Sequence, residues 1–307
     1  MKASEIDVMT AKLFFRAAFP AMKVPLTESA KHIKKFEKIN TVVSFKAEDD
    51  ENPVACYIVF LDEATAEKTA LKKRFKVYQG EYPGYIEMED GSQLTCLEVI
   101  NMHFKSIKAL LGVFKGAKAS DQMGILPCIF KNMSKKAFFP FLGLMMELTK
   151  TGPKFNPSAK DPLNQYLKVK MSLYLITTAL SSANKLGWTP MTKWTERQSD
   201  RIYQFQVGPT LDKKGNEIYP AIGAYLRVKA GNTKAGRGVY ERKRPFVLFD
   251  FINPDGCLAL LSGKYEFVEC VAKKYVAIIG SGDSYAPQFN EIMALCQSLL
   301  VPAPKKK

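Results

Sequence analysis

The sequence predicts an α+β protein built from two tandem domains that follow one plan. A chain of 307 residues is long enough for two ordinary domains, each with its own apolar core. The composition, 47% hydrophobic and 24% charged, is that of a folded globular chain. Two stretches with the same order of helices, prolines and strands lie on either side of a segment rich in turn formers.

The boundary between the domains is marked by turn-forming residues. Residues 151–158 contain one glycine and two prolines, and Asp161-Pro162 follows, an N-cap residue with a proline in the first helical turn. We therefore expect a first domain at 1–150, a linker at 151–160 and a second domain at 161–307.

Each domain opens with an apolar helix, which a proline and a short charged amphipathic segment follow. These elements are typical of a helical layer that precedes a sheet. The matched pairs are 4–19 with 162–186, Pro25 with Pro190, and 31–38 with 191–198.

Strands follow in both domains, because β-branched and aromatic residues alternate with polar ones between turn residues. Each domain then reaches an Asp-Gly pair and a closing helix, and spacing predicts an insertion in the first domain within 101–123. The expected strands are 41–46, 54–60, 74–78 and 85–88, then 201–207, 221–228, 239 onward and 245–251. The Asp-Gly pairs are 90–91 and 255–256, and the closing helices are 137–148 and 286–300.

The six cysteines are dispersed, and no two have the C-x-x-C spacing of a zinc or redox site. Most lie in apolar runs, so we interpret them as buried thiols of a protein in a reducing, cytoplasmic compartment. The longest dense apolar cluster, 137–146, is about half of the roughly 20 residues that span a bilayer. We therefore expect no membrane span.

The net charge of +15 predicts attraction to anionic surfaces, which include nucleic acid and acidic lipid headgroups. Aromatic residues stand among basic ones at 73–78 and 240–246, as they do where sheets hold single strands. A nucleic-acid-binding module is therefore the alternative function, although no recognition motif accompanies these residues.

Catalytic signals are weak. Neither of the two histidines, His32 and His103, has a carboxylate or nucleophile nearby in the sequence that suggests a triad. The glycine-rich segment 231–238 lacks the Gly-Lys-Ser/Thr ending of a phosphate loop. We expect no enzyme, no cofactor and no metal site, while an enzyme using only Asp, Glu, Lys or Tyr stays open.

The closing helices are unusually apolar. In the second domain, apolar residues recur on one helical face, and the first domain has the same stripe plus apolar residues on the opposite side. We expect the first-domain helix to lie between layers or to line a cavity, and 12 methionines and 20 phenylalanines suit an adaptable apolar pocket. The stripes are Ala286, Phe289, Ile292, Met293 and Cys296, and Phe138, Phe141, Leu142, Met145 and Leu148, with Phe139, Leu144 and Met146 opposite.

The end of the second domain resembles the sterol carrier protein type two domain. The resemblance rests on a strand at 245–251, a short helix ending in Leu-Leu-Ser-Gly263, a strand ending in Gly280 and the apolar helix from Ala286. The first domain matches in order only, and 125–130 has to serve as its last strand.

This resemblance implies twisted, mainly antiparallel sheets covered by helices, each enclosing an apolar pocket for a fatty acyl chain or sterol-like lipid. The implied function is binding or transfer of that lipid without catalysis, and the charge allows peripheral contact with an anionic membrane. The ligand identity and oligomeric state stay open. The expected lipid-binding residues are Phe289, Ile292, Met293, Leu258 and Leu261 in the second domain, and Phe138, Phe141 and Met145 in the first.

Overall fold

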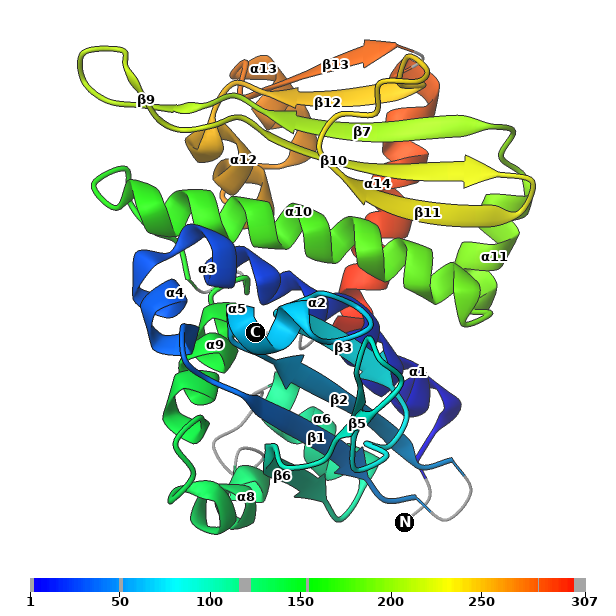
Figure 1. The fold of residues 1–307 in the computed structure, drawn as a ribbon. Coiled ribbons are helices and arrows are strands. Elements are labelled where there is room, and N and C mark those ends of the chain that lie inside the picture. Colours follow the sequence, from blue (N-terminus) through cyan, green and yellow to red (C-terminus); the bar gives the residue numbers. More distant parts are fainter. Residues whose placement is uncertain (1–2, 50–51, 116–122, 153–154, 281, 301–307) are drawn as a thin grey trace. The chain divides into compact units, whose positions relative to one another are not determined.

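The computed structural model describes residues 3–49, 52–115, 123–152, 155–280 and 282–300 (Figure 1). The chain forms two compact units. Unit 1 is Met1–Met146 together with the chain from Leu299, and unit 2 is Glu147–Ser298. Both combine helices with a mixed sheet, which confirms the predicted α+β class.

The first helical layer of unit 1 begins at a capped N-terminus. Ser4 Oγ accepts a hydrogen bond from the Asp7 backbone N–H (3.2 Å), and Asp7 Oδ2 accepts one from the Ser4 N–H (3.2 Å). This reciprocal pair is a capping box, which satisfies two amides that the helix leaves open. The layer comprises α1 (Glu5–Leu13), the π-helical turn η1 (Phe14–Ala18), α2 (Phe19–Ala21), α3 (Lys23–Glu28) and α4 (Ala30–Phe36).

The main sheet of unit 1 has four strands in the order β3-β2-β1-β6. The central strand β1 is antiparallel to β2 and parallel to β6. The strands are β1 (Thr41–Ala47), β2 (Val54–Phe60), β3 (Phe75–Gln79) and β6 (Glu98–Phe104), with α5 (Glu63–Glu67), β4 (Ile86–Glu87) and β5 (Gln93–Leu94) between β2 and β6. The later helices are α6 (Ile107–Lys115), the short 3-10 helix η2 (Met123–Ile125), α8 (Leu126–Asn132) and α9 (Phe138–Thr149).

The two faces of this sheet have different covers. Successive side chains of a strand point to opposite faces, and Phe45 of β1 meets the rings of Phe15, Phe19, Phe114 and Phe141 on the helical face. On the other face, the segment 61–97 closes over a second apolar cluster. That cluster consists of Val42, Val59, Leu61, Ala66 and Ile86, with Tyr57, Tyr78, Tyr82, Leu94, Leu97 and Val99 packed against it.

Unit 2 has a five-stranded main sheet in the order β11-β10-β7-β12-β13. Its strands are β7 (Arg201–Val207), β10 (Ile222–Lys229), β11 (Asn232–Arg237), β12 (Val247–Phe251) and β13 (Val276–Gly280), with a hairpin of β8 (Thr210–Leu211) and β9 (Glu217–Tyr219). Its helices are α10 (Pro162–Lys185), α11 (Thr189–Glu196), α12 (Pro254–Leu261), α13 (Phe267–Ala272) and α14 (Gly282–Leu300).

The helices α10 and α14 cover the same face of this sheet (Figure 1). Ser181 of α10 exchanges hydrogen bonds of 3.2 Å with Thr233 of β11. Phe289 of α14 meets Phe205 of β7, and strand alternation places Thr233 and Phe205 on one face.

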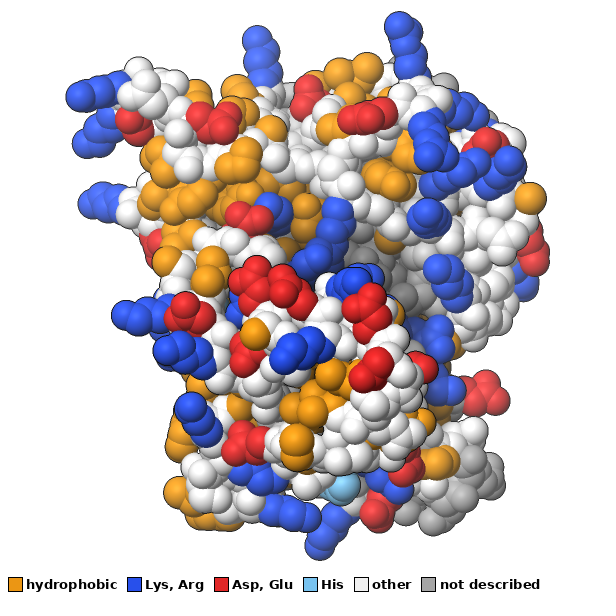
Figure 2. All heavy atoms as spheres, in the orientation of Figure 1, with side chains coloured by type: hydrophobic (Ala, Val, Ile, Leu, Met, Phe, Trp, Pro, Cys, Tyr) orange, Lys and Arg blue, Asp and Glu red, His pale blue; other side chains and the backbone are white. Residues whose placement is uncertain are grey.

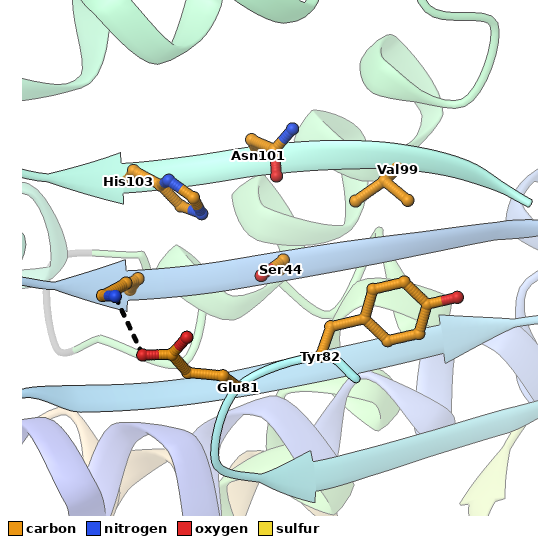
Figure 3. A pocket seen from close by; sticks show the side chains of 7 residues that line it. Ser44, Glu81, Tyr82, Val99, Asn101 and His103 are labelled. Carbon is orange, nitrogen blue, oxygen red and sulfur yellow. Dashed lines mark ion pairs between the residues drawn. The ribbon is translucent and has the colours of Figure 1, made fainter. Parts of the chain in front are cut away.

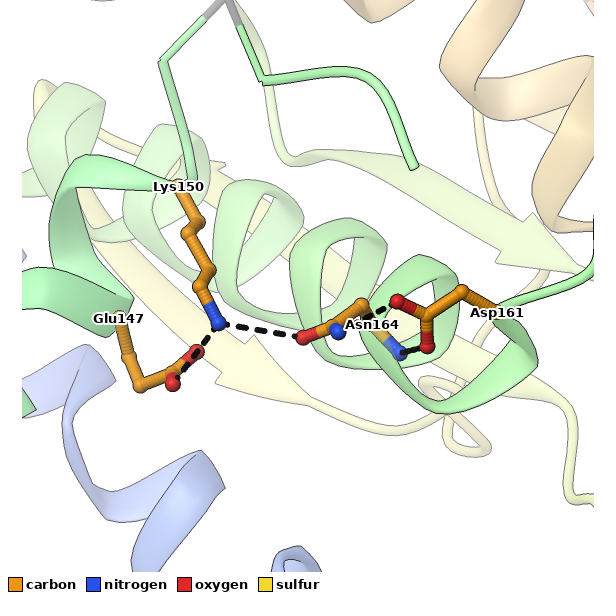
Figure 4. Close-up of polar contacts among 4 residues, drawn as sticks. All are labelled: Glu147, Lys150, Asp161 and Asn164. Atoms are coloured by element: carbon orange, nitrogen blue, oxygen red, sulfur yellow. Dashed lines mark hydrogen bonds and ion pairs between the residues drawn. The ribbon is translucent and has the colours of Figure 1, made fainter. Parts of the chain in front are cut away.

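The start of α10 is held by a polar network (Figure 4). The Asn164 backbone N–H donates to Asp161 Oδ1 (3.3 Å), and Asn164 Nδ2 donates to Asp161 Oδ2 (2.6 Å). Lys150 Nζ lies 2.9 Å from Glu147 Oε1 and 3.3 Å from Asn164 Oδ1. This network joins the residues before the Gly/Pro-rich segment to the helix after it.

The two sheets share four strands in the same order and directions. β1 corresponds to β7, since each is antiparallel to the next long strand and parallel to a later one. Phe45 lies opposite Cys56 and Met102, and Phe205 lies opposite Ala224 and Phe249, so both phenylalanines hold the same register position.

Two details of the sequence comparison were wrong. Asp90-Gly91 lies in the turn between β4 and β5, whereas Asp255-Gly256 lies in the first turn of α12. The expected strand 125–130 is helical, because Leu126 and Pro127 open α8 with a proline in the first turn.

The predicted insertion is also misplaced. The chain from β2 to β6 carries α5, β3, β4 and β5, whereas the chain from β10 to β12 carries only β11. The extra residues of unit 1 therefore form the cover on the second face of its sheet, rather than lying within 101–123.

Candidate functional site

The helix–sheet interface of unit 2 contains Phe289, the central residue of the predicted lipid site. Its side chain is fully buried. Its ring centroid lies 4.3 Å from Tyr203 in a stacked arrangement, 5.8 Å from Phe249 and from Trp194, and 5.9 Å from Phe205. α14 is thus held on the sheet by a cluster of aromatic rings, a geometry that is attractive beyond area burial alone.

The other predicted residues of unit 2 lie on α14 and α12. Ile292 and Leu258 are buried, while Met293 and Leu261 are half-buried. The predicted face of α14 therefore passes from a closed aromatic centre at Phe289 to a partly open edge at Met293.

Unit 1 has a corresponding interface under α9. Phe138 and Phe141 are fully buried, and Met145 is half-buried. The Phe141 ring lies 6.0 Å from Phe45 and 6.4 Å from Phe60. Phe141 and Phe289 thus meet the same register position of their central strands, and each precedes a half-buried methionine by four residues.

The expectation that α9 is apolar on both sides because it is enclosed was wrong. Leu144 is buried, but Phe139 is 60% exposed and Met146 is 65% exposed. Helical periodicity identifies apolar residues on two sides, yet it does not say whether protein or solvent meets the second side.

A polar pocket of about 210 Å³ lies on the other face of the unit 1 sheet (Figure 3). Asn101 and His103 lie on β6, Ser44 lies on the neighbouring β1, and the segment with Glu81 and Tyr82 lies in front of the next strand, β2. The pocket lies at the edge of the cover formed by 61–97. The lining residues are Ser44, Lys46, Glu81, Tyr82, Val99, Asn101 and His103.

An ion pair spans one end of this polar pocket. Lys46 Nζ lies 2.8 Å from Glu81 Oε1. Hydrogen bonding and charge attraction in this pair raise the pKa of Lys46 and lower that of Glu81. Both groups are solvent-accessible, so the pair adds little to stability.

His103 and Tyr82 supply the other polar groups. Partial burial, and then the positive charges of Lys131 and Lys46, lower the pKa of His103, which favours the neutral imidazole. The buried Tyr82 Oη has no hydrogen-bond partner in the described part of the chain. The hydroxyl of Ser44, the amide of Asn101 and the imidazole of His103, which line the pocket, are the groups that could hydrogen-bond a compact polar molecule.

Sequence reasoning missed this pocket because it compared His103 only with its neighbours along the chain. The parallel register of β1 and β6 places Lys46 opposite His103 and Ser44 opposite Asn101. The sequence does contain a signal for this pocket: polar residues two apart, Ser44 and Lys46 on one strand and Asn101 and His103 on the other, point to the same face of the sheet.

Metal sites and membrane spans are two further features that bear on function. The described residues contain no group of three or more His, Cys, Asp or Glu side chains that could hold a metal ion. None of the helices in the described ranges combines the length and apolar character needed to cross a membrane.

Comparison with known proteins found matches among solved structures. No family model and no curated protein matches the chain. Among solved structures, it is similar to the solution structure of a conserved hypothetical protein from Thermus thermophilus, described as a possible sterol carrier protein. The two are 14% identical, the likeness covers 43% of this chain and 90% of that one, and the TM-score is 0.29. A TM-score of that size does not establish a common fold.

Proposed function

We propose that the protein binds and transfers an apolar ligand, such as a fatty acyl chain or a sterol-like lipid, without reacting with it. The observation that carries this proposal is the closing helix of unit 2. It presents Phe289 to an aromatic sheet surface and then a half-buried methionine, Met293, at the edge of the same interface. The sequence resemblance of residues 245 onward to the sterol carrier protein type two domain supports the same assignment.

The physical basis is transfer of hydrocarbon from water to an apolar surface. Burying about ten methylenes at roughly 0.8 kcal/mol each stabilises a complex by about 8 kcal/mol before binding costs. Methionine suits the edge of such a site, because its unbranched side chain adapts to different shapes. A guest would enter beside Met293, at the half-buried edge of the α14 interface, and would share the apolar surface of Ile292.

Unit 1 repeats the main features of this site. Phe141 and Met145 on α9 hold places that match Phe289 and Met293, and Phe138 lies one turn before Phe141. We propose that the predicted domains 1–150 and 161–307 are divergent copies of one fold, joined by 151–160, and that each offers a helix–sheet interface for an apolar guest.

Binding of a fluorescent fatty acid to purified protein tests this proposal, together with native mass spectrometry and organic extraction. Met293→Asp places a carboxylate at the edge of the interface, where burying it without a partner costs several kcal/mol. We expect the fatty acid affinity to fall at least tenfold. The matched control is Leu295→Asp on the same helix, where the native side chain is 45% exposed and affinity should stay within about twofold.

Thermal melting separates loss of binding from loss of folding. If Met293→Asp melts well below the wild type, Met293→Gln, which carries no charge, takes its place. Wild-type protein that yields no extractable lipid and binds no acyl or sterol probe would refute the function.

A further inference from the structure

We propose that one surface of unit 1 docks the protein on a membrane that contains acidic phospholipids. This surface, here the α8 surface, consists of Met123, Phe130, Met133 and Phe139 with Lys131 and Lys136. Membrane docking rests on the proposed function in one respect: a carrier of lipids has to contact membranes to take up and release its ligand.

The α8 surface exposes large apolar side chains within a short stretch of chain. Phe130 is 70% exposed, Phe139 60%, Met123 59% and Met133 51%. Single exposed apolar residues are common on proteins, but a group of them marks an interaction site. Figure 2 shows hydrophobic side chains beside Lys or Arg side chains at the lower left of the molecule, where α8 lies in Figure 1.

The helix α8, which carries Phe130, is held on the unit 1 sheet by hydrogen bonds to β6. Asn132 is fully buried, and its Nδ2 donates to Asn101 O (2.8 Å) while its Oδ1 accepts from the Asn101 N–H (3.0 Å). Cys128, one turn earlier, donates through Sγ to His103 O (3.4 Å). Because Cys128 and Asn132 face β6, Phe130 and Met133 face away from it.

The stretch of chain that carries this surface is rich in lysine. Among the described residues, the one acidic side chain bonded to it is Glu98, which accepts hydrogen bonds from the Lys136 and Ala137 backbone N–H groups (both 3.1 Å). Between Glu98 and Glu147 the sequence contains seven lysines and a single acidic residue, Asp121. Lys131 and Lys136 are both exposed beside the apolar side chains. Apolar side chains that insert at the headgroup boundary, with cations around them, are the combination that anionic membranes attract.

This combination favours a membrane over nucleic acid. Proteins hold single strands with aromatic rings on which bases stack, beside a basic groove. Two of the four apolar side chains here are methionines, which provide no ring, and none of the four lies on a strand of the sheet. A lipid surface needs only apolar volume and positive charge.

Co-sedimentation of the full chain with lipid vesicles tests the proposal. One vesicle type is phosphatidylcholine alone, and the other contains about one third phosphatidylserine. We expect binding to the acidic vesicles that is at least tenfold tighter and weakens as salt shortens the range of the charges. Phe130→Asp with Met133→Asp should lower this binding at least tenfold, and Lys131→Glu with Lys136→Glu should do the same.

The matched control is Val268→Asp in unit 2, an apolar residue on α13 that is 77% exposed, where vesicle binding should stay within about twofold. Fatty acid binding in solution should be unchanged in every variant, so failure of the α8 surface and failure of the proposed function give different results. If both double variants bind acidic vesicles as the wild type does, the proposal is overturned. It is also overturned if the wild type binds no vesicles but binds an oligonucleotide, and the double variants lose that oligonucleotide binding.

Discussion

Cys96 differs from the other five cysteines in its surroundings. All six thiols are free, yet Cys96 is exposed while Cys56, Cys128, Cys257, Cys270 and Cys296 are buried. Burial raises the pKa of the buried thiols, and that of Cys296 to about 12, because a thiolate is costly in an apolar environment. Cys96 is therefore the thiol that a reagent in solution can reach in the native chain.

We therefore expect a thiol reagent at pH 8 to modify one cysteine per native chain and six after denaturation. Since the reactive form is the thiolate, Cys96→Ser should leave the native chain almost inert. Because the folded-state pKa of a buried thiol lies above the ordinary value of 9.0, unfolded chains lose this proton first, and stability falls as pH rises past that value. Rapid modification of a second native thiol would contradict this account.

At the residue scale, the sequence predicted which side chains are buried better than what they contact. The phenylalanines of the closing helices were expected at an apolar interface, and Phe138, Phe141 and Phe289 are fully buried. Their aromatic partners come from distant strands, and local periodicity contains no information on those pairings. His103 illustrates the same limit, since its neighbours in the polar pocket arrive through strand register.

Among the elements, α10 carries an unusual residue, Lys168. Its side chain is almost fully buried, and its Nζ donates to Gly152 O (3.0 Å) and to Phe155 O. Burial lowers the pKa of this ammonium group. Lys168 thereby ties the Gly/Pro-rich segment to the helix that follows it, and Gln165 Nε2 adds a bond of 3.2 Å to Pro157 O.

We expect this segment to resist limited proteolysis in the wild-type protein, despite its composition. Lys168→Met keeps the apolar stem of the side chain and removes its donors, so two half-buried carbonyls lose their Lys168 partner, at a cost of about 1 kcal/mol for each hydrogen bond. Cleavage between residues 150 and 160, followed by mass spectrometry, should accelerate. Lys185→Met, at the exposed far end of α10, is the control, and equal cleavage of both variants would exclude this role.

Helix starts were the most predictable elements, because their signals are local. Asp161, which the sequence indicated as an N-cap, accepts a hydrogen bond from the Asn164 backbone N–H at the start of α10. The segment 125–130 was the clearest error, because a short apolar run does not distinguish a buried strand from a helix on a sheet. Its proline was the available signal for a helix start.

For the whole molecule, the shared strand order makes a prediction about geometry. We expect an experimental structure to show that the four common strands superpose, with Phe45 on Phe205 and, as a consequence, Phe141 on Phe289. The reason is that equal register on the central strand fixes where the closing helix meets the sheet. Different strand orders in the two units, or closing helices on opposite faces, would end the case for duplication.

One difference between the units has a consequence for assembly. Unit 2 places β13 beside β12, while within the described part of unit 1 the outer side of β6 meets Asn132, whose amide makes with Asn101 the paired bonds that a neighbouring strand would make. A side chain in the place of a strand protects an edge that would otherwise recruit the backbone of another molecule. Asn132 thus occupies the hydrogen-bonding groups through which a second copy of the chain could add a strand to β6. Replacing Asn132 would leave that edge of β6 available for pairing between copies.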